Sequence, residues 1–148
     1  MDSRLQSVPM KTLLVLSLLL QATSGTVYKK CELARIFKGS ALNNHYNSLA
    51  HWVCVAEAES GFDTSAKTGN RYGIFKISSG RWCDDGTSQF SNNLCRISCN
   101  NFLDDDITDD IRCAIRISQS HVGIEEWVAW LSNCGRRDLS HFLDGCEQ

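Results

Sequence analysis

Two stretches near the start of the chain have apolar side chains at helical spacing. The first, residues 31–37, places them at i, i+3 and i+4, which predicts an amphipathic helix that ends near Gly39. The second follows Ser48, a residue type that caps helices, and stops at Gly61. The apolar positions of the two predicted helices are Leu33, Ile36, Phe37, Leu49, Trp52, Val53 and Ala56.

Residues 62–82 change the pattern. The segment 71–77, RYGIFKI, is short, aromatic and β-branched and follows a Gly-Asn pair, which predicts a small hairpin. Residues 83–103 carry three cysteines among Ser, Asn and Gly, and this composition predicts loops.

Helical spacing returns in the last third of the chain. One helix is expected from Thr108, with Ile111 and Ile115 on its apolar face, and another over residues 125–131. The second would place three apolar side chains on one face: Trp127, Val128 and Leu131. With the hairpin, these helices predict an α+β fold that is mostly helical and has a minor antiparallel sheet.

The first 25 residues have the pattern of a secretory signal peptide. A positive start with Arg4 and Lys11 precedes the apolar run of residues 13–20, and small residues follow up to Gly25. A membrane-spanning helix needs about 20 apolar residues, so this run is too short to be one. We expect cleavage after Gly25 and a secreted, extracellular domain over 26–148, with an uncleaved signal anchor as the alternative.

Charge and composition exclude some classes of function. The net charge is −2, which argues against a nucleic-acid binder that works by neutralising phosphates. A hydrophobic content of 43% is typical of a globular protein rather than a disordered chain. Without residues 1–25 the net charge becomes −3, so long-range attraction to anionic surfaces is weak.

All eight cysteines lie beyond the predicted signal peptide, which favours disulfides formed in an oxidising compartment. Zinc binding by Cys95 and Cys99 is the alternative. The chain lacks a second close pair of Cys or His at zinc spacing, which weighs against that alternative. The spacing alone does not fix which cysteines pair.

Several segments together resemble the C-type lysozyme and α-lactalbumin family across essentially the whole chain after residue 25. They are CELAR at 31–35, WVCVA at 52–56, ES at 59–60, YGIF at 72–75, RWC at 81–83, CRISC at 95–99, WVAW at 127–130 and DLS at 138–140. The resemblance implies an α-lobe and a small β-lobe that flank a sugar-binding cleft. It also implies four disulfides: Cys31–Cys146, Cys54–Cys134, Cys83–Cys99 and Cys95–Cys113.

Five aspartates lie within residues 104–110. Crowded carboxylates repel unless a cation or solvent relieves them, and hard oxygen ligands suit calcium. The alternative is that these charges stabilise the N-terminus of the predicted helix. The resemblance favours calcium, because segment 101–111 is similar to the calcium elbow of α-lactalbumin and of calcium-binding lysozymes. It implies one structural Ca²⁺ held by side-chain oxygens of Asp104, Asp109 and Asp110 and by carbonyl oxygens of Asn101 and Asp106.

Cleavage of a glycosidic bond normally takes two carboxyl groups, one a protonated acid and the other a nucleophile or base. The resemblance implies that Glu59 is the acid, with Trp127 packed beside it to keep it protonated. Without the resemblance, the sequence would favour a solvated glutamate at the end of a helix. The family's second acid immediately precedes Tyr-Gly-Ile, where this chain has Arg71. Glu57 and Asp63 stand at positions from which they do not replace it.

Other positions of the implied cleft also depart from the family. The stretch 66–72 is shorter, Lys76 replaces a glutamine, Ser78 an asparagine and Arg81 an aromatic sugar platform. The residues that remain as expected cleft walls are Trp82, Ile117, Trp127 and Val128. An arginine facing Glu59 would favour the ionised carboxylate, which is the wrong state for a general acid.

We therefore expect a secreted, calcium-binding, lysozyme-like protein, antibacterial by family and a monomer. It would bind, and hydrolyse weakly or not at all, the β-1,4-linked N-acetylmuramic acid and N-acetylglucosamine polymers of bacterial cell walls. Two alternatives are a non-catalytic extracellular recognition protein, which Arg71 and Arg81 fit, and an α-lactalbumin-like regulator of a glycosyltransferase. Glu57 and Ala58 weigh against the regulator, because α-lactalbumin presents an aromatic residue and a histidine there.

Overall fold

The computed structural model describes residues 25–44, 48–87 and 89–146. The predicted signal peptide lies outside these residues apart from Gly25. Within the described residues, no helix is both long enough and apolar enough to cross a bilayer. The helical elements, in chain order, are α2 (Lys30–Lys38), η1 (Ala41–Asn44), α3 (Leu49–Ser60), η2 (Cys99–Leu103), α4 (Thr108–Ser118), η3 (Gly123–Glu126) and α5 (Val128–Asn133).

The ends of α3 follow from its sequence. The hydroxyl oxygen of Ser48 accepts a hydrogen bond from the backbone N–H of His51, which satisfies an otherwise unpaired donor of the first turn. Gly61 ends the helix with a φ of 59°, a left-handed conformation that glycine adopts without steric cost. The helix therefore ends at Ser60, before β1 begins at Lys67, and Glu59 lies in its last turn.

The β-lobe is a small antiparallel sheet of three short strands in the order β1 (Lys67–Thr68), β2 (Arg71–Tyr72) and β3 (Ile77–Ser78). Arg71 lies in the middle strand, opposite Thr68 on one side and Ser78 on the other. The turn from β2 to β3 contains two left-handed residues, Gly73 and Lys76, with φ of 82° and 45°. The predicted hairpin is thus present, with strands of two residues each.

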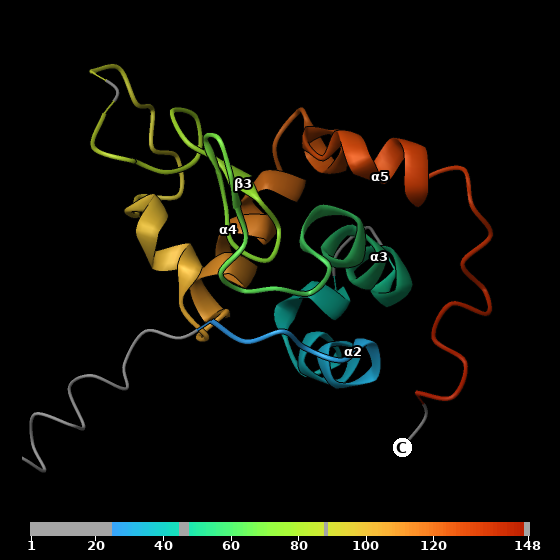
Figure 1. Cartoon of the computed structure of the whole chain (residues 1–148). Helices are drawn as coiled ribbons and strands as arrows, with labels where there is room; N and C mark the ends of the chain where they lie inside the picture. The colour runs from blue at the N-terminus through green and yellow to red at the C-terminus, as the bar shows by residue number, and fades with distance from the viewer. Residues whose placement is uncertain (1–24, 45–47, 88, 147–148) are drawn as a thin grey trace, which may run out of the picture.

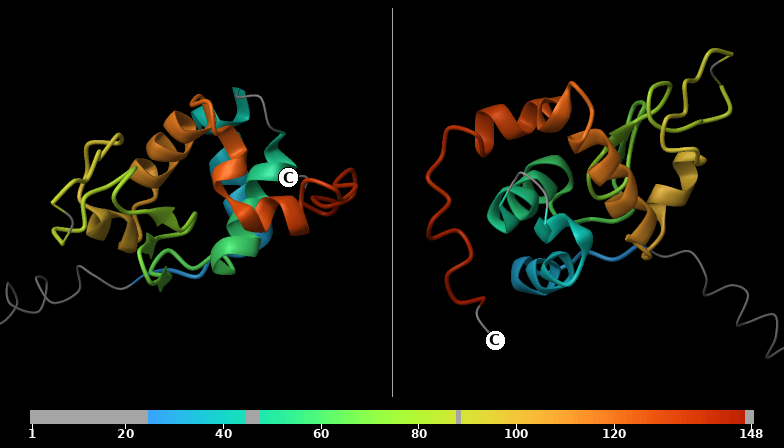
Figure 2. Two further views of the ribbon diagram at one scale, coloured as in Figure 1. Left: turned by 90° about the horizontal axis from the view of Figure 1, so that it is seen from above. Right: turned by 180° about the vertical axis from the view of Figure 1, so that it is seen from behind.

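The two lobes share α4. Figure 1 shows the strands beside α4, and α2 and α3 beyond it, and the two views of Figure 2 show the same order. Gly73 approaches this side of the molecule so closely that a Cβ atom there would lie 2.4 Å from the Phe102 carbonyl oxygen and 2.5 Å from Oδ1 of Asp110. Only glycine fits this contact between the sheet, η2 and α4.

Aromatic rings fill the contact between the lobes. Trp127 packs edge-on against Trp52 with ring centroids 5.7 Å apart, and Phe75 lies 6.1 Å from Trp127. The indole N–H of Trp127 donates a 2.7 Å hydrogen bond to the Phe75 carbonyl oxygen. The largest fully buried side chains include Trp52, Trp82, Trp127, Phe37, Phe75, Phe102, Leu33, Leu42, Ile74, Ile77 and Ile117.

The region 125–131 differs from the single helix that the sequence predicts. The backbone leaves helical geometry at Trp127, with φ −96° and ψ 97°, between η3 and α5. This break turns Trp127 into the core, while Val128 and Leu131 are 67% and 43% exposed. The expectation that these three side chains share one face is therefore wrong, because the helical period does not continue through the break.

Four disulfides link the described cysteines: Cys31–Cys146, Cys54–Cys134, Cys83–Cys99 and Cys95–Cys113. These are the pairs that the family resemblance implies. The Cys31–Cys146 bond ties α2 to the C-terminal segment, which runs past α3 and α2 in Figure 1. The fold is the expected α+β architecture, a helical lobe with a small antiparallel sheet and four disulfides.

Candidate functional site

Glu59 lies in the last turn of α3, partly buried, where the helix meets the β-lobe. Burial raises the pKa of its carboxyl above the ordinary value of 4.5. Arg71, Lys76 and the backbone of Ala129 act in the opposite direction and lower that pKa. Burial is the largest of these effects, so the pKa of Glu59 stays above its ordinary value despite the two cations.

Arg71 is fixed beside Glu59 by the turn that follows its strand. Its Nε donates a 3.0 Å hydrogen bond to the carbonyl oxygen of Lys76. Its Nη2 is buried and has no hydrogen-bond partner among the described residues. The left-handed backbone of Lys76 presents that carbonyl to Arg71, so the shape of the turn itself places a guanidinium group near the acid.

The charges around Glu59 limit its chemistry. Both side chains that act on its pKa are cations, Arg71 and Lys76. The groups that act on the pKa of Glu59 thus include no second carboxyl group, whereas a glycosidase of the two-carboxylate type uses two. Neither cation can act as the nucleophile or base that such a reaction needs, because each has no free lone pair while protonated.

Three of the expected cleft walls are covered by other parts of the chain. Trp82, Ile117 and Trp127 are 1%, 0% and 0% exposed, whereas Val128 is 67% exposed. The guanidinium of Arg81 lies 5.1 Å from the centroid of the Trp82 ring. This distance allows a cation–π contact between Arg81 and the neighbouring indole.

Two polar contacts that the sequence did not reveal cross from the β-lobe to the segment before α5. The hydroxyl of Ser78 donates a 2.9 Å hydrogen bond to Oε1 of Glu126. Arg81 Nη2 lies 3.4 Å from His121 Nε2. The partners are 48 and 40 residues apart in sequence, so no local pattern could have paired them.

The acidic segment contains a buried carboxylate. Asp110 is 0% exposed, and neither of its carboxylate oxygens has a hydrogen-bond partner among the described residues. Burial and then Asp109 raise the pKa of Asp110 well above its ordinary value. Asp104 is partly buried and its pKa is also raised, with burial as the largest cause, while Asn101 and Asp106 are exposed.

The acidic segment meets some of the requirements of a cation site but not all of them. An ionised carboxylate without a partner in the protein interior is costly, and a bound cation would offset that cost. In the described residues, however, no group of three or more His, Cys, Asp or Glu side chains is close enough to form a metal site. The donor set is oxygen only, the type that Ca²⁺ prefers.

The model of the C-type lysozyme/alpha-lactalbumin family matches residues 26–146. The chain belongs to this family. Lysozyme C-2 of Sus scrofa is 46% identical over 145 residues, which cover 93% of this chain and 99% of that protein. The milk isozyme of lysozyme C of Bos taurus is 44% identical over 146 residues, with the same coverage.

Solved structures of the family have the same fold. The holo form of canine milk lysozyme superposes with a TM-score of 0.79 at 44% identity, covering 83% of this chain and 99% of that one. The apo form gives a TM-score of 0.80 at 43% identity. Membership of the C-type lysozyme family is consistent with hydrolysis or binding of peptidoglycan.

Proposed function

We propose that this chain is a secreted, calcium-stabilised member of the C-type lysozyme family that binds β-1,4-linked N-acetylhexosamine polymers and hydrolyses them slowly or not at all. The observation that carries the proposal is the pair of cations, Arg71 and Lys76, that act on the Glu59 carboxyl. A two-carboxylate mechanism needs a base or nucleophile there.

Glu59 would serve as the general acid. Its raised pKa keeps more of it protonated near neutral pH than an ordinary glutamate, which is what proton donation to a leaving oxygen requires. Arg71 is held by its bond to the Lys76 carbonyl and cannot complete the pair. A lone acid supports only slow hydrolysis by water. The chain would therefore bind the sugar polymer but cleave it slowly.

Sugar binding is supported by two of the expected cleft residues, Trp82 and Val128. The indole N–H of Trp82 is buried without a partner among the described residues, which leaves a donor that a sugar hydroxyl would satisfy. Val128 offers exposed apolar surface for the sugar face. The expected cleft walls Ile117 and Trp127 would support this surface from beneath.

Calcium would bind at residues 101–110. Asp104, Asp109 and Asp110 would supply carboxylate oxygens, and Asn101 and Asp106 backbone carbonyl oxygens. The bound ion would supply positive charge beside Asp110, whose carboxylate has no partner among the described residues. Support comes from that orphaned carboxylate and from the relative described as the holo form of canine milk lysozyme.

The test is a calorimetric titration of the secreted chain with chitotriose, followed by a search for cleaved products in the same samples. The proposal expects saturable binding and little or no cleavage. The α-lactalbumin-like alternative predicts instead no chitotriose binding and a gain of lactose synthesis when the chain is added to a galactosyltransferase with glucose.

A further inference from the structure

One surface depression is lined by residues other than those expected to bind sugar. It has a volume of about 310 Å³ and lies between α4 and the loop that contains Cys95. Its lining consists of Cys95, Arg96, Ile97, Asp109, Arg112, Cys113, Ile115, Arg116 and Gln119. None of these residues belongs to the expected cleft, but Asp109 is also one of the expected calcium ligands. We call this depression the arginine pocket.

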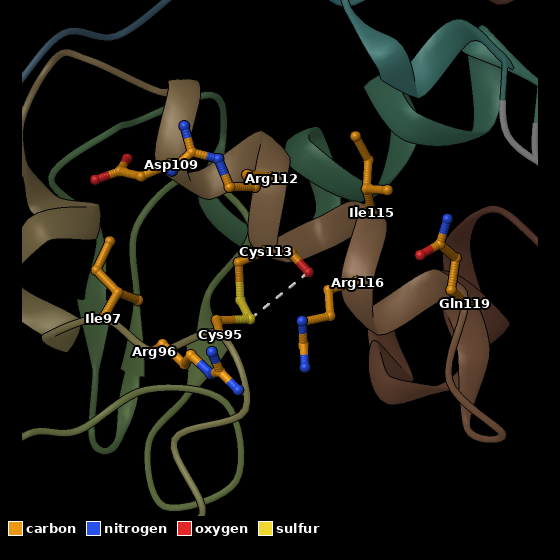
Figure 3. Close-up of a pocket in the computed structure, with 9 residues that line it drawn as sticks. All are labelled: Cys95, Arg96, Ile97, Asp109, Arg112, Cys113, Ile115, Arg116 and Gln119. Carbon is orange, nitrogen blue, oxygen red and sulfur yellow. Dashed lines mark hydrogen bonds between the residues drawn. A yellow bond between two sulfur atoms is a disulfide. The ribbon is translucent and has the colours of Figure 1, made fainter.

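The arginine pocket carries three guanidinium groups and one carboxylate. Within the described residues, none of its arginines lies within 4.0 Å of an acidic group, and none of their side chains makes a hydrogen bond. Figure 3 shows Arg96 and Arg116 on the same side of the Cys95–Cys113 disulfide, whereas Arg112 points toward Asp109. The Asp109 carboxylate already accepts a 2.9 Å hydrogen bond from the backbone N–H of Asp110.

The backbone holds Arg96 in place. It adopts a φ of 55°, a left-handed conformation that is uncommon for a residue with a side chain. The Arg96 N–H donates to the Asn93 carbonyl oxygen at 2.8 Å, and the next N–H, of Ile97, donates to Asn93 Oδ1 at 2.9 Å. Cys95, directly before it, is bonded to Cys113 of α4. Arg96 is thus fixed relative to the helix that carries Arg116.

These features point to an anion. Arg112 points toward Asp109 and also lowers the pKa of Asp106, whereas Arg96 and Arg116 have no acidic partner within 4.0 Å among the described residues. An oxyanion between Arg96 and Arg116 would supply the missing counter-charge and satisfy several N–H donors at once. The rest of the chain is slightly acidic, so the attraction is local to the arginine pocket rather than a property of the whole surface. Gln119, at the opposite end of the lining, offers an amide that can donate to and accept from a hydroxyl group.

We propose that the arginine pocket binds a sulfate or phosphate monoester carried on a sugar. Arg96 and Arg116 contact the tetrahedral oxyanion, Arg112 adds positive charge, and Gln119 contacts a hydroxyl of the sugar. The site is separate from the predicted cleft, so binding there neither requires nor reports on hydrolysis.

The experiment is a calorimetric titration of the full secreted chain, at low and constant ionic strength, with glucose 6-sulfate, glucose 6-phosphate and glucose. Variants Arg96→Gln and Arg116→Gln each remove one donor group. Arg136→Gln is the matched control, because it removes the same charge from an exposed arginine outside the arginine pocket. Thermal melts verify that all variants fold.

We expect saturable binding of at least one ester at a single site and none of glucose. The tighter of the two esters identifies the anion. Each pocket variant should weaken binding about tenfold or more, as expected when a hydrogen bond to a charged group is lost, and Arg136→Gln should leave it unchanged. Two results would overturn the proposal: absence of saturable binding of both esters, or equal weakening by Arg136→Gln.

Discussion

The side chains of Ser78 and Glu126 are joined by a 2.9 Å hydrogen bond, although one lies on β3 and the other at the end of η3. Together with the contact between Arg81 and His121, this bond connects the two sides of the junction at which sugar is expected to bind. The junction is therefore crossed by polar contacts, and a sugar chain bound there as proposed would have to displace them.

Removing the carboxylate of Glu126 should favour sugar binding. In Glu126→Ala the Ser78 hydroxyl has no partner across the junction, and the free energy of breaking one hydrogen bond no longer opposes the ligand. We expect chitotriose affinity to rise about two- to tenfold, the equivalent of one ordinary hydrogen bond. The control is Glu125→Ala, which removes the same charge from an exposed neighbour. Weaker binding by Glu126→Ala would show that Glu126 holds the sugar instead.

Calcium should raise the stability of the native chain. A ligand that binds only the folded state stabilises it by about 2.7 kcal/mol at a hundredfold excess over its Kd. Asp110→Asn should lose this gain, because the buried carboxylate is gone. In EDTA, the variant should be at least as stable as the native chain. Asp105→Asn, at an exposed position outside the implied ligand set, is the control. Melting curves with calcium and with EDTA measure both effects, and equal curves for the native chain would refute calcium binding.

The raised pKa of Glu59 has a consequence for stability. The folded chain holds this proton more tightly than the unfolded chain, so the contribution of Glu59 to stability decreases as pH rises from about 4.5 through the raised value. In Glu59→Gln this decrease is absent. We expect the stability of the variant relative to the native chain to increase with pH over that range, in urea unfolding curves recorded at several pH values. If the stability of Glu59→Gln relative to the native chain decreased with pH instead, the effect of Arg71 and Lys76 on the pKa of Glu59 would exceed that of burial.

Arg71 can be tested directly on the same carboxyl. Among the groups that lower the pKa of Glu59, Arg71 has the largest effect, so Arg71→Gln should raise that pKa further. An NMR titration that follows the Glu59 carboxyl carbon measures the change, and Arg136→Gln serves as the control for net charge. An unchanged pKa in Arg71→Gln would place the guanidinium too far from Glu59 to matter.

Much of the fold could be predicted from the sequence because its signals are local. The apolar stripe and Ser48 defined α3, and cysteine positions together with the family resemblance implied the disulfides that the structure contains. The break at Trp127 could not be predicted, because the apolar pattern runs through it and only tertiary packing of the indole against Trp52 and Phe75 favours the turn.

For the candidate site, the sequence identified single residues but not the contacts that these residues make. The replacement of the family's second acid by Arg71 was visible, whereas its bond to the Lys76 carbonyl depends on a left-handed turn without a glycine. For Glu59 the sequence supported two opposing expectations, protonation through packing by Trp127 and ionisation through Arg71. It did not show the extent of burial, which raises the pKa.

We propose that this chain has kept sugar binding and has lost efficient hydrolysis. The most direct measurement compares release of cell-wall fragments by the native chain, by Glu59→Gln and by an ordinary C-type lysozyme, with chitotriose affinity measured on the same samples. We predict micromolar to millimolar binding by the native chain and a rate about a hundredfold or more below that of the ordinary enzyme, the loss typical of a missing catalytic group. A rate equal to that of the ordinary enzyme, lost in Glu59→Gln, would contradict the account.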